Sequence, residues 1–132
     1  MPELPVILVA EDDQSLQDFL EETLKEAGFD AAIIASGEEA VTLLTRQKDK
    51  YRALVTDINL LGSMDGWEAA QRAREIDHAF PVIYMSGADA EDWGVKGVPN
   101  SIMLAKPFAP AQLVTALAQL LNAAPPPATP GT

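Results

Sequence analysis

The sequence predicts an α/β domain in which a doubly wound, five-stranded parallel sheet is flanked by helices. Five short apolar runs of strand length alternate with stretches whose apolar residues recur at helical spacing. The first run, residues 6–10 (VILVA), is apolar at every position, which is typical of a strand covered on both faces. Strands and helices that alternate in this way form parallel sheets between two helical layers.

Start and stop signals bound the first strands and helices. After the strand at 6–10, apolar residues recur at helical spacing until Gly28, which favours a helix end. Residues 29–35 are predicted to form the second strand, and Ser36 with Glu39 forms a capping box that opens the second helix. The residues expected on the buried faces of these two helices are Leu16, Phe19, Leu20, Leu24, Ala27, Ala40, Val41, Leu43 and Leu44.

The second half of the chain repeats the alternation. Residues 53–57, 81–85 and 101–104 are predicted to form the third, fourth and fifth strands. Asp65 can cap the helix after the third strand, and Pro110 suits the first turn of the last helix. The residues expected on the buried faces of these helices are Trp67, Ala70, Ala73, Ile76, Leu113, Val114, Leu117, Leu120 and Leu121.

Two segments depart from this regular pattern. Two glycines and a proline interrupt residues 88–100, so a helix there must be short or irregular. Residues 123–132 include three consecutive prolines and little that can pack, which predicts a disordered tail. We therefore expect one domain over residues 1–122, followed by the tail at 123–132.

Composition excludes several kinds of site and partner. The chain has no cysteine, so it can form neither a disulfide nor a cysteine-ligated metal site. Its net charge of −11 argues against binding to nucleic acid or to an anionic membrane. The N-terminus lacks the features of a signal peptide, and no apolar stretch approaches the roughly 20 residues that cross a bilayer. These features predict a cytoplasmic protein.

Polar side chains follow four of the five predicted strands. Sites in open parallel sheets form at the carboxyl ends of the strands, so these side chains are expected to converge. A cluster of carboxylates needs a cation nearby, because otherwise at least one of them would protonate. The residues at the four strand ends are Glu11, Asp12 and Asp13, then Asp57, then Ser86, then Lys106.

These groups together suit phosphoryl chemistry. Oxygen ligands without sulfur or clustered imidazole favour Mg²⁺, which also accepts phosphate oxygens. A carboxylate nucleophile can take a phosphoryl group to give an aspartyl phosphate. A metal ion and an ammonium group then balance the charge on the transferred oxygens. The sequence therefore predicts a phosphoryl-accepting carboxylate beside a magnesium site.

Five motifs carry a resemblance to the receiver domain of two-component response regulators, in the single-domain form of chemotaxis regulators. They occur in the order and at close to the spacing of that family, over most of residues 5–122. The resemblance implies a flavodoxin-like sheet with strand order 2-1-3-4-5. The motifs are residues 7–13 (ILVAEDD), 55–59 (VTDIN), 64–66 (MDG), 81–87 (PVIYMSG) and 104–108 (LAKPF).

The resemblance also implies a set of acidic site residues. Asp57 is the expected phosphoacceptor and contributes to the metal site, where Asp12 is a direct ligand of Mg²⁺. The backbone carbonyl of Asn59 completes the protein ligands, and Glu11 acts on the metal through water. Asp13 is left open, because it could point into the site in place of Glu11 or cap the first helix.

By the same resemblance, Ser86 supplies a hydroxyl to the phosphoryl group and Lys106 pairs with it. The bond between Lys106 and Pro107 is expected to be cis. The implied donor is a histidine kinase or phosphotransfer protein of a two-component or phosphorelay system. The implied output is contact with an unknown downstream protein, and the only chemistry expected of the domain is self-phosphorylation and slow self-dephosphorylation.

Departures from the family leave alternatives open. The loop at residues 60–63 is one residue longer than usual and lacks the common proline, and Met103 replaces the usual aromatic residue of the fifth strand. A non-catalytic interaction module, or a receiver piece cut from a hybrid histidine kinase, is the main alternative function. A hydrolase with Asp57 as nucleophile is disfavoured, because Asn59 stands where a second acid is expected.

Overall fold

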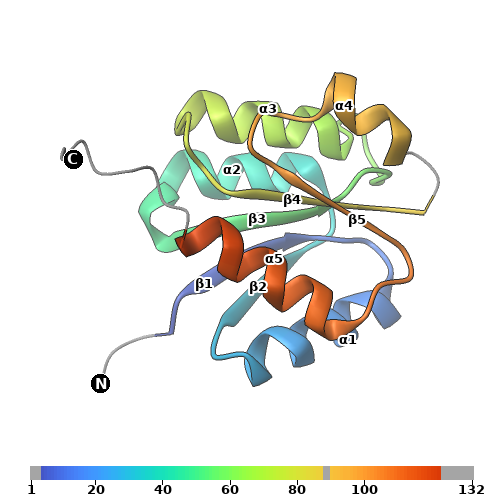
Figure 1. The fold of residues 1–132 in the computed structure, drawn as a ribbon. Coiled ribbons are helices and arrows are strands. Elements are labelled where there is room, and N and C mark those ends of the chain that lie inside the picture. Colours follow the sequence, from blue (N-terminus) through green and yellow to red (C-terminus); the bar gives the residue numbers. More distant parts are fainter. Residues whose placement is uncertain (1–3, 88–89, 123–132) are drawn as a thin grey trace, which may run out of the picture.

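All neighbouring strands of the sheet are parallel, and helices cover both of its faces (Figure 1). The computed structural model describes residues 4–87 and 90–122. The strands are β1 (Val6–Ala10), β2 (Asp30–Ile34), β3 (Tyr51–Asp57), β4 (Val82–Ser86) and β5 (Ile102–Ala105). Their order, β2-β1-β3-β4-β5, confirms the predicted topology.

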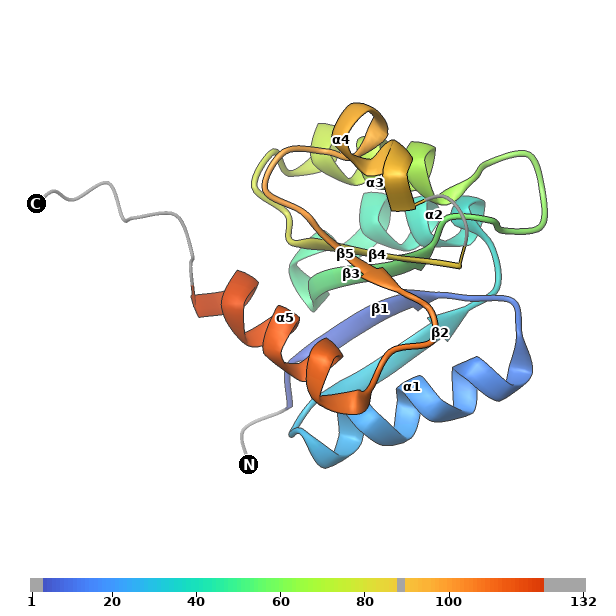
Figure 2. The same ribbon diagram turned by 45° about the vertical axis from the view of Figure 1, so that its right-hand side comes forward.

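Helices cover each main face of the sheet, as the two views in Figures 1 and 2 show. One layer contains α1 (Gln14–Glu26) and α5 (Pro110–Asn122), and the other contains α2 (Gly37–Gln47) and α3 (Gly66–Ile76). Side chains of each strand alternate between these layers: Val55 packs in the cluster of α1 and α5, and Leu54 packs in the cluster of α2 and α3. Burial on both faces explains why the strands are apolar at nearly every position.

The predicted N-cap residues Ser36 and Asp65 each make a cap hydrogen bond. The Ser36 hydroxyl accepts a hydrogen bond from the Glu39 backbone N–H at 3.2 Å. Asp65 caps α3 by accepting from the Glu68 N–H at 2.9 Å. Strand bounds differ from the predictions by one or two residues, most at β3, which begins at Tyr51 because the 3-10 turn Lys48–Lys50 leads directly into it.

The segment before β5 is irregular, as predicted. It contains a 3-10 turn at Ala90–Asp92 and the single-turn helix α4 (Trp93–Lys96). The Trp93 indole N–H donates to the Ser101 hydroxyl at 2.9 Å, and that hydroxyl donates to the Val98 carbonyl at 2.6 Å. The Val98 N–H in turn donates to the buried Tyr84 hydroxyl at 3.1 Å. These bonds hold the segment on the core where regular helix is missing.

The predicted disordered tail, residues 123–132, lies outside the described residues. Within residues 4–87 and 90–122, no helix has the length and apolar character that a membrane span requires.

We expect the Tyr84→Phe substitution to lower the free energy of unfolding by about 1–3 kcal/mol. The substitution removes the acceptor of the buried Val98 N–H and leaves that donor without a partner. The measurement is urea denaturation followed by circular dichroism. Tyr51→Phe is the matched control, because the Tyr51 hydroxyl makes no hydrogen bond to the described residues. Equal stability of the two variants would show that the Tyr84 hydroxyl does not anchor the segment.

Candidate functional site

Three carboxylates and one ammonium group meet at the carboxyl edge of the sheet. Glu11 and Asp12 follow β1, Asp57 ends β3 and Lys106 follows β5. One carboxylate oxygen from each of the three acids lies within 4.8 Å of the other two. The Lys106 ammonium nitrogen lies 2.9 Å from Asp57 Oδ2 and 3.5 Å from Glu11 Oε1. The structure thus brings together four residues that sequence reasoning placed at three strand ends.

Asp57 is held from three sides. Its side chain accepts hydrogen bonds from Lys106 Nζ and from the Asn59 backbone N–H, the latter at 3.2 Å. Gly66 covers its backbone, since a Cβ at that position would lie 2.1 Å from the Asp57 carbonyl oxygen. Sequence reasoning included Gly66 in a motif without finding this role, because the close approach depends on how the loop folds back.

Glu11 is the most buried acid of the cluster. Its exposed fraction is 0%, and Oε2 accepts a hydrogen bond from the Asp13 backbone N–H at 3.0 Å. Burial raises the pKa of Glu11 to about 7; the charge of Asp57 adds to this, while the Asp13 N–H and the Lys106 charge oppose it. Buried Oε1 has no hydrogen-bond partner among the described residues. Oε1 therefore faces the cluster with only the charge of Lys106, 3.5 Å away, beside it.

Lys106 balances only part of the negative charge. Burial lowers its pKa, but the hydrogen bond and charge of Asp57, together with the charge of Glu11, outweigh burial and raise the pKa above its ordinary value. Lys106 therefore stays protonated and offers one positive charge to three carboxylates. A divalent cation fits this set of oxygen donors, and its charge would relieve the repulsion that remains.

Of the two neighbouring acids, Glu11 belongs to the acidic cluster and Asp13 caps the helix that follows. Asp13 caps α1, with Oδ2 accepting from the Leu16 N–H at 2.9 Å, and it is exposed. Asp12 remains in the cluster, and its Oδ2 accepts from the Leu61 N–H at 3.2 Å. Sequence reasoning missed the Leu61 contact, since a backbone donor 49 residues away leaves no mark on the pattern.

Ser86 and Asn59 lie next to this cluster. Ser86 is 1% exposed and ends β4, one residue after Met85, the register partner of Asp57. Its carbonyl accepts from the Lys106 N–H at 2.8 Å, and the bond between Lys106 and Pro107 is cis, as the resemblance implied. Asn59 is joined to Asp57 by the hydrogen bond of its N–H. Their roles toward a metal or a phosphoryl group stay predictions.

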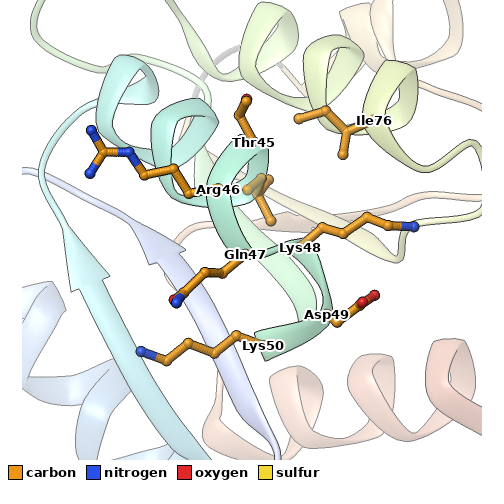
Figure 3. Close-up of a pocket in the computed structure, with 8 residues that line it drawn as sticks. Thr45, Arg46, Gln47, Lys48, Asp49, Lys50 and Ile76 are labelled. Atoms are coloured by element: carbon orange, nitrogen blue, oxygen red, sulfur yellow. The ribbon is translucent and has the colours of Figure 1, made fainter.

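A concave region lies at the other end of the sheet, where α2 leads into β3 (Figure 3). It carries Arg46, Lys48 and Lys50, with Asp49 as its only acid. Because β3 begins beside this region and ends at Asp57, the region is separated from the acidic cluster by the length of the strand. Its basic side chains make it unsuited to a cation.

Sequence comparisons assign the fold and the cluster to a known family. The response regulator receiver domain family matches residues 7–118. The chain is 34% identical over 120 residues to the response regulator receiver protein CpdR of Brucella abortus, covering 89% of this chain and 98% of that protein. It is also 34% identical over 110 residues to the transcriptional regulatory protein HprR of Escherichia coli, covering 82% of this chain and 48% of that protein.

Solved structures agree with the sequence comparisons. A response regulator receiver protein from Sinorhizobium medicae superimposes with a TM-score of 0.88 at 45% identity, covering 92% of this chain and 97% of that one. The receiver domain of a Pseudomonas aeruginosa sensor histidine kinase, which has a magnesium ion coordinated in its active site cleft, gives a TM-score of 0.80 at 25% identity, with 92% and 100% covered. The chain therefore belongs to the response regulator receiver domain family, whose members are signalling modules of two-component systems.

Proposed function

We propose that this receiver domain accepts a phosphoryl group on Asp57 with Mg²⁺ bound beside it. The observation that carries the proposal is the 2.9 Å contact between Lys106 Nζ and Asp57 Oδ2 within a cluster of three carboxylates. Asp12, Asp57 and the Asn59 carbonyl are the proposed direct ligands of the ion, and Glu11 acts through water. Glu11 Oε1, which is buried and accepts no hydrogen bond from the described residues, supports such a role.

The proposed transfer is a displacement at phosphorus. A carboxylate oxygen of Asp57 forms the new bond to phosphorus as the bond to the donor breaks, and the donor group leaves with the electron pair. Lys106 is placed to pair with an oxygen of the transferred group, and the Ser86 hydroxyl to donate to another. Bound Mg²⁺ supplies positive charge to those oxygens.

The partners follow from this chemistry. Receiver domains interact with histidine kinases or phosphotransfer proteins, and we propose that one of these is the donor here. The output is then contact with a downstream protein, in the cytoplasm. The net charge of −11 gives direct binding to nucleic acid no electrostatic support.

A non-catalytic interaction module, or a receiver piece of a hybrid histidine kinase, has the same fold. The chain spans about half the length of most of the curated relatives, such as HprR. The phosphorylation experiment below separates the non-catalytic module from an active receiver.

We expect the wild-type protein to gain one phosphoryl group when it is incubated with acetyl phosphate and Mg²⁺, as measured by intact mass. Asp57→Asn should give no adduct, because the amide is a poor nucleophile, and neither should wild type in excess EDTA. Asp49→Asn, a matched change at the opposite end of β3, should be modified like wild type. An adduct that persists in Asp57→Asn would place the acceptor elsewhere. No adduct on wild type from acetyl phosphate or from a cognate kinase would favour the non-catalytic module.

We expect Lys106→Met to slow phosphorylation of Asp57 by about 100-fold, the scale of removing one donor that stabilises transition-state charge. The measurement is the initial rate of adduct formation at saturating Mg²⁺, after circular dichroism shows that the variant is folded. Lys96→Met is the control, because the described contact of the Lys96 side chain is an exposed ion pair with Asp92 at 3.8 Å. Equal rates for both lysine variants would remove Lys106 from the reaction.

A further inference from the structure

The loop between β3 and α3 is tethered at its tip to the start of α2. Glu38, in the first turn of α2, accepts two hydrogen bonds on Oε2 from Ser63: from the backbone N–H at 3.0 Å and from the hydroxyl at 2.8 Å. These two residues are 25 positions apart in the sequence. The loop contains no proline to restrict its backbone, so its position depends on contacts of this kind.

Two glycines allow the loop and the helix to approach each other. Gly62 has φ +102°, and a Cβ there would lie 3.0 Å from Glu38 Oε1. Gly37 lies against Met64, where a Cβ would come within 3.1 Å of Met64 Cγ. A Cβ at either position would make a contact so tight that the facing atoms would have to shift by a few tenths of an ångström. The close fit therefore extends over consecutive residues on both sides of the contact.

The same loop contacts the acidic cluster. Two residues before Ser63, the Leu61 N–H donates to Asp12 Oδ2 at 3.2 Å. Glu38 is therefore connected to Asp12 by hydrogen bonds at each end and by the short backbone between Leu61 and Ser63. Hydrogen bonds to a ligating carboxylate fix its orientation and contribute to metal affinity.

We propose that Glu38 is a positioning residue for the metal site: it holds the tip of the loop so that the Leu61 N–H orients Asp12. Among the described residues, no hydrogen bond or ion pair joins Glu38 to Asp12 or Asp57, and its link to the site is the loop. This inference rests on the proposed function, because it assigns Glu38 a role toward the Mg²⁺ that Asp12 would bind.

Comparison with the neighbouring Glu39 shows that the contact with the loop is specific to Glu38. Any carboxylate in the first turn of α2 gains from the partial positive charge of the helix N-terminus, and both Glu38 and Glu39 stand there. Of these two acids, only Glu38 has a described contact with the loop. The side chain of Glu39 is exposed, and its backbone N–H donates to the Ser36 hydroxyl. The hydrogen bond from the Ser63 hydroxyl lowers the pKa of Glu38, so the tether is a charged acceptor at neutral pH.

The experiment compares Glu38→Ala with Glu39→Ala, which lose the same charge from the same helical turn. Titration calorimetry with MgCl₂ should show about 10-fold weaker binding for Glu38→Ala and near wild-type binding for Glu39→Ala. Hydrogen exchange without metal should show faster exchange of the Leu61 and Ser63 amides in Glu38→Ala only. Ser63→Ala, which removes one of the two bonds, should give an intermediate loss of affinity and serves if Glu38→Ala fails to fold.

The outcomes separate this inference from the proposed function. If wild type binds Mg²⁺ and accepts a phosphoryl group, while both glutamate variants bind Mg²⁺ alike, the role of Glu38 is refuted and the proposed function stands. If wild type binds no Mg²⁺, both proposals fail together. If Ser63→Ala exchanges and binds metal like wild type, the tether does not position the loop.

Discussion

The repulsion between carboxylates at one edge of the sheet is the constraint on which the site depends. Glu11, Asp12 and Asp57 lie so close that one ammonium group cannot balance them, and burial raises the pKa of Glu11 to about 7. Each acid is placed by the end of a parallel strand, so the fold itself forces them together. Lys106 is fixed in turn by its backbone N–H, which bonds to the last residue of β4. The sheet therefore holds the charges in place, and the remaining imbalance favours a cation.

Sequence patterns predicted the fold well because its signals are local. Continuous apolar runs marked strands buried on both faces, and Ser36 and Asp65 marked helix starts by caps that the structure contains. The site was predicted to the level of strand ends, since the carboxyl ends of parallel strands share one edge. The choice between Glu11 and Asp13 was out of reach, because it depends on which of two neighbouring acids the first turn of α1 uses as its cap. The contacts of Glu38 and Leu61 were out of reach too, since they join distant parts of the chain.

The family resemblance leads us to expect an aromatic residue at position 103 of β5. In this chain position 103 is Met, and the aromatic residue beside it is Tyr84 of β4. Met103 is the register partner of Tyr84, and it packs against a cluster that contains Tyr84 and Trp67. The Trp67 and Tyr84 rings are 4.7 Å apart, and the Tyr84 hydroxyl is engaged by the Val98 N–H. Movement of this ring would break a buried hydrogen bond, which costs about 1–3 kcal/mol. The Tyr84 hydroxyl, two residues before Ser86 in β4, thus ties the core to the segment before β5, and Met103 packs beside the tyrosine.

The loop after Asp57 illustrates how close contact can replace a rigid residue. Proline would restrict the backbone directly, whereas this loop is held at its base by the Gly66 N–H bond to the Ile58 carbonyl at 2.8 Å and at its tip by Glu38. Both anchors need glycine: Gly66 lies against the Asp57 carbonyl, and Gly62 adopts a positive φ beneath the Glu38 carboxylate. The bond between Gly66 and Ile58 joins the two ends of the loop, and the bonds between Ser63 and Glu38 hold its tip. The loop that follows Asp57 is therefore held in part by α2, a helix outside the acidic cluster.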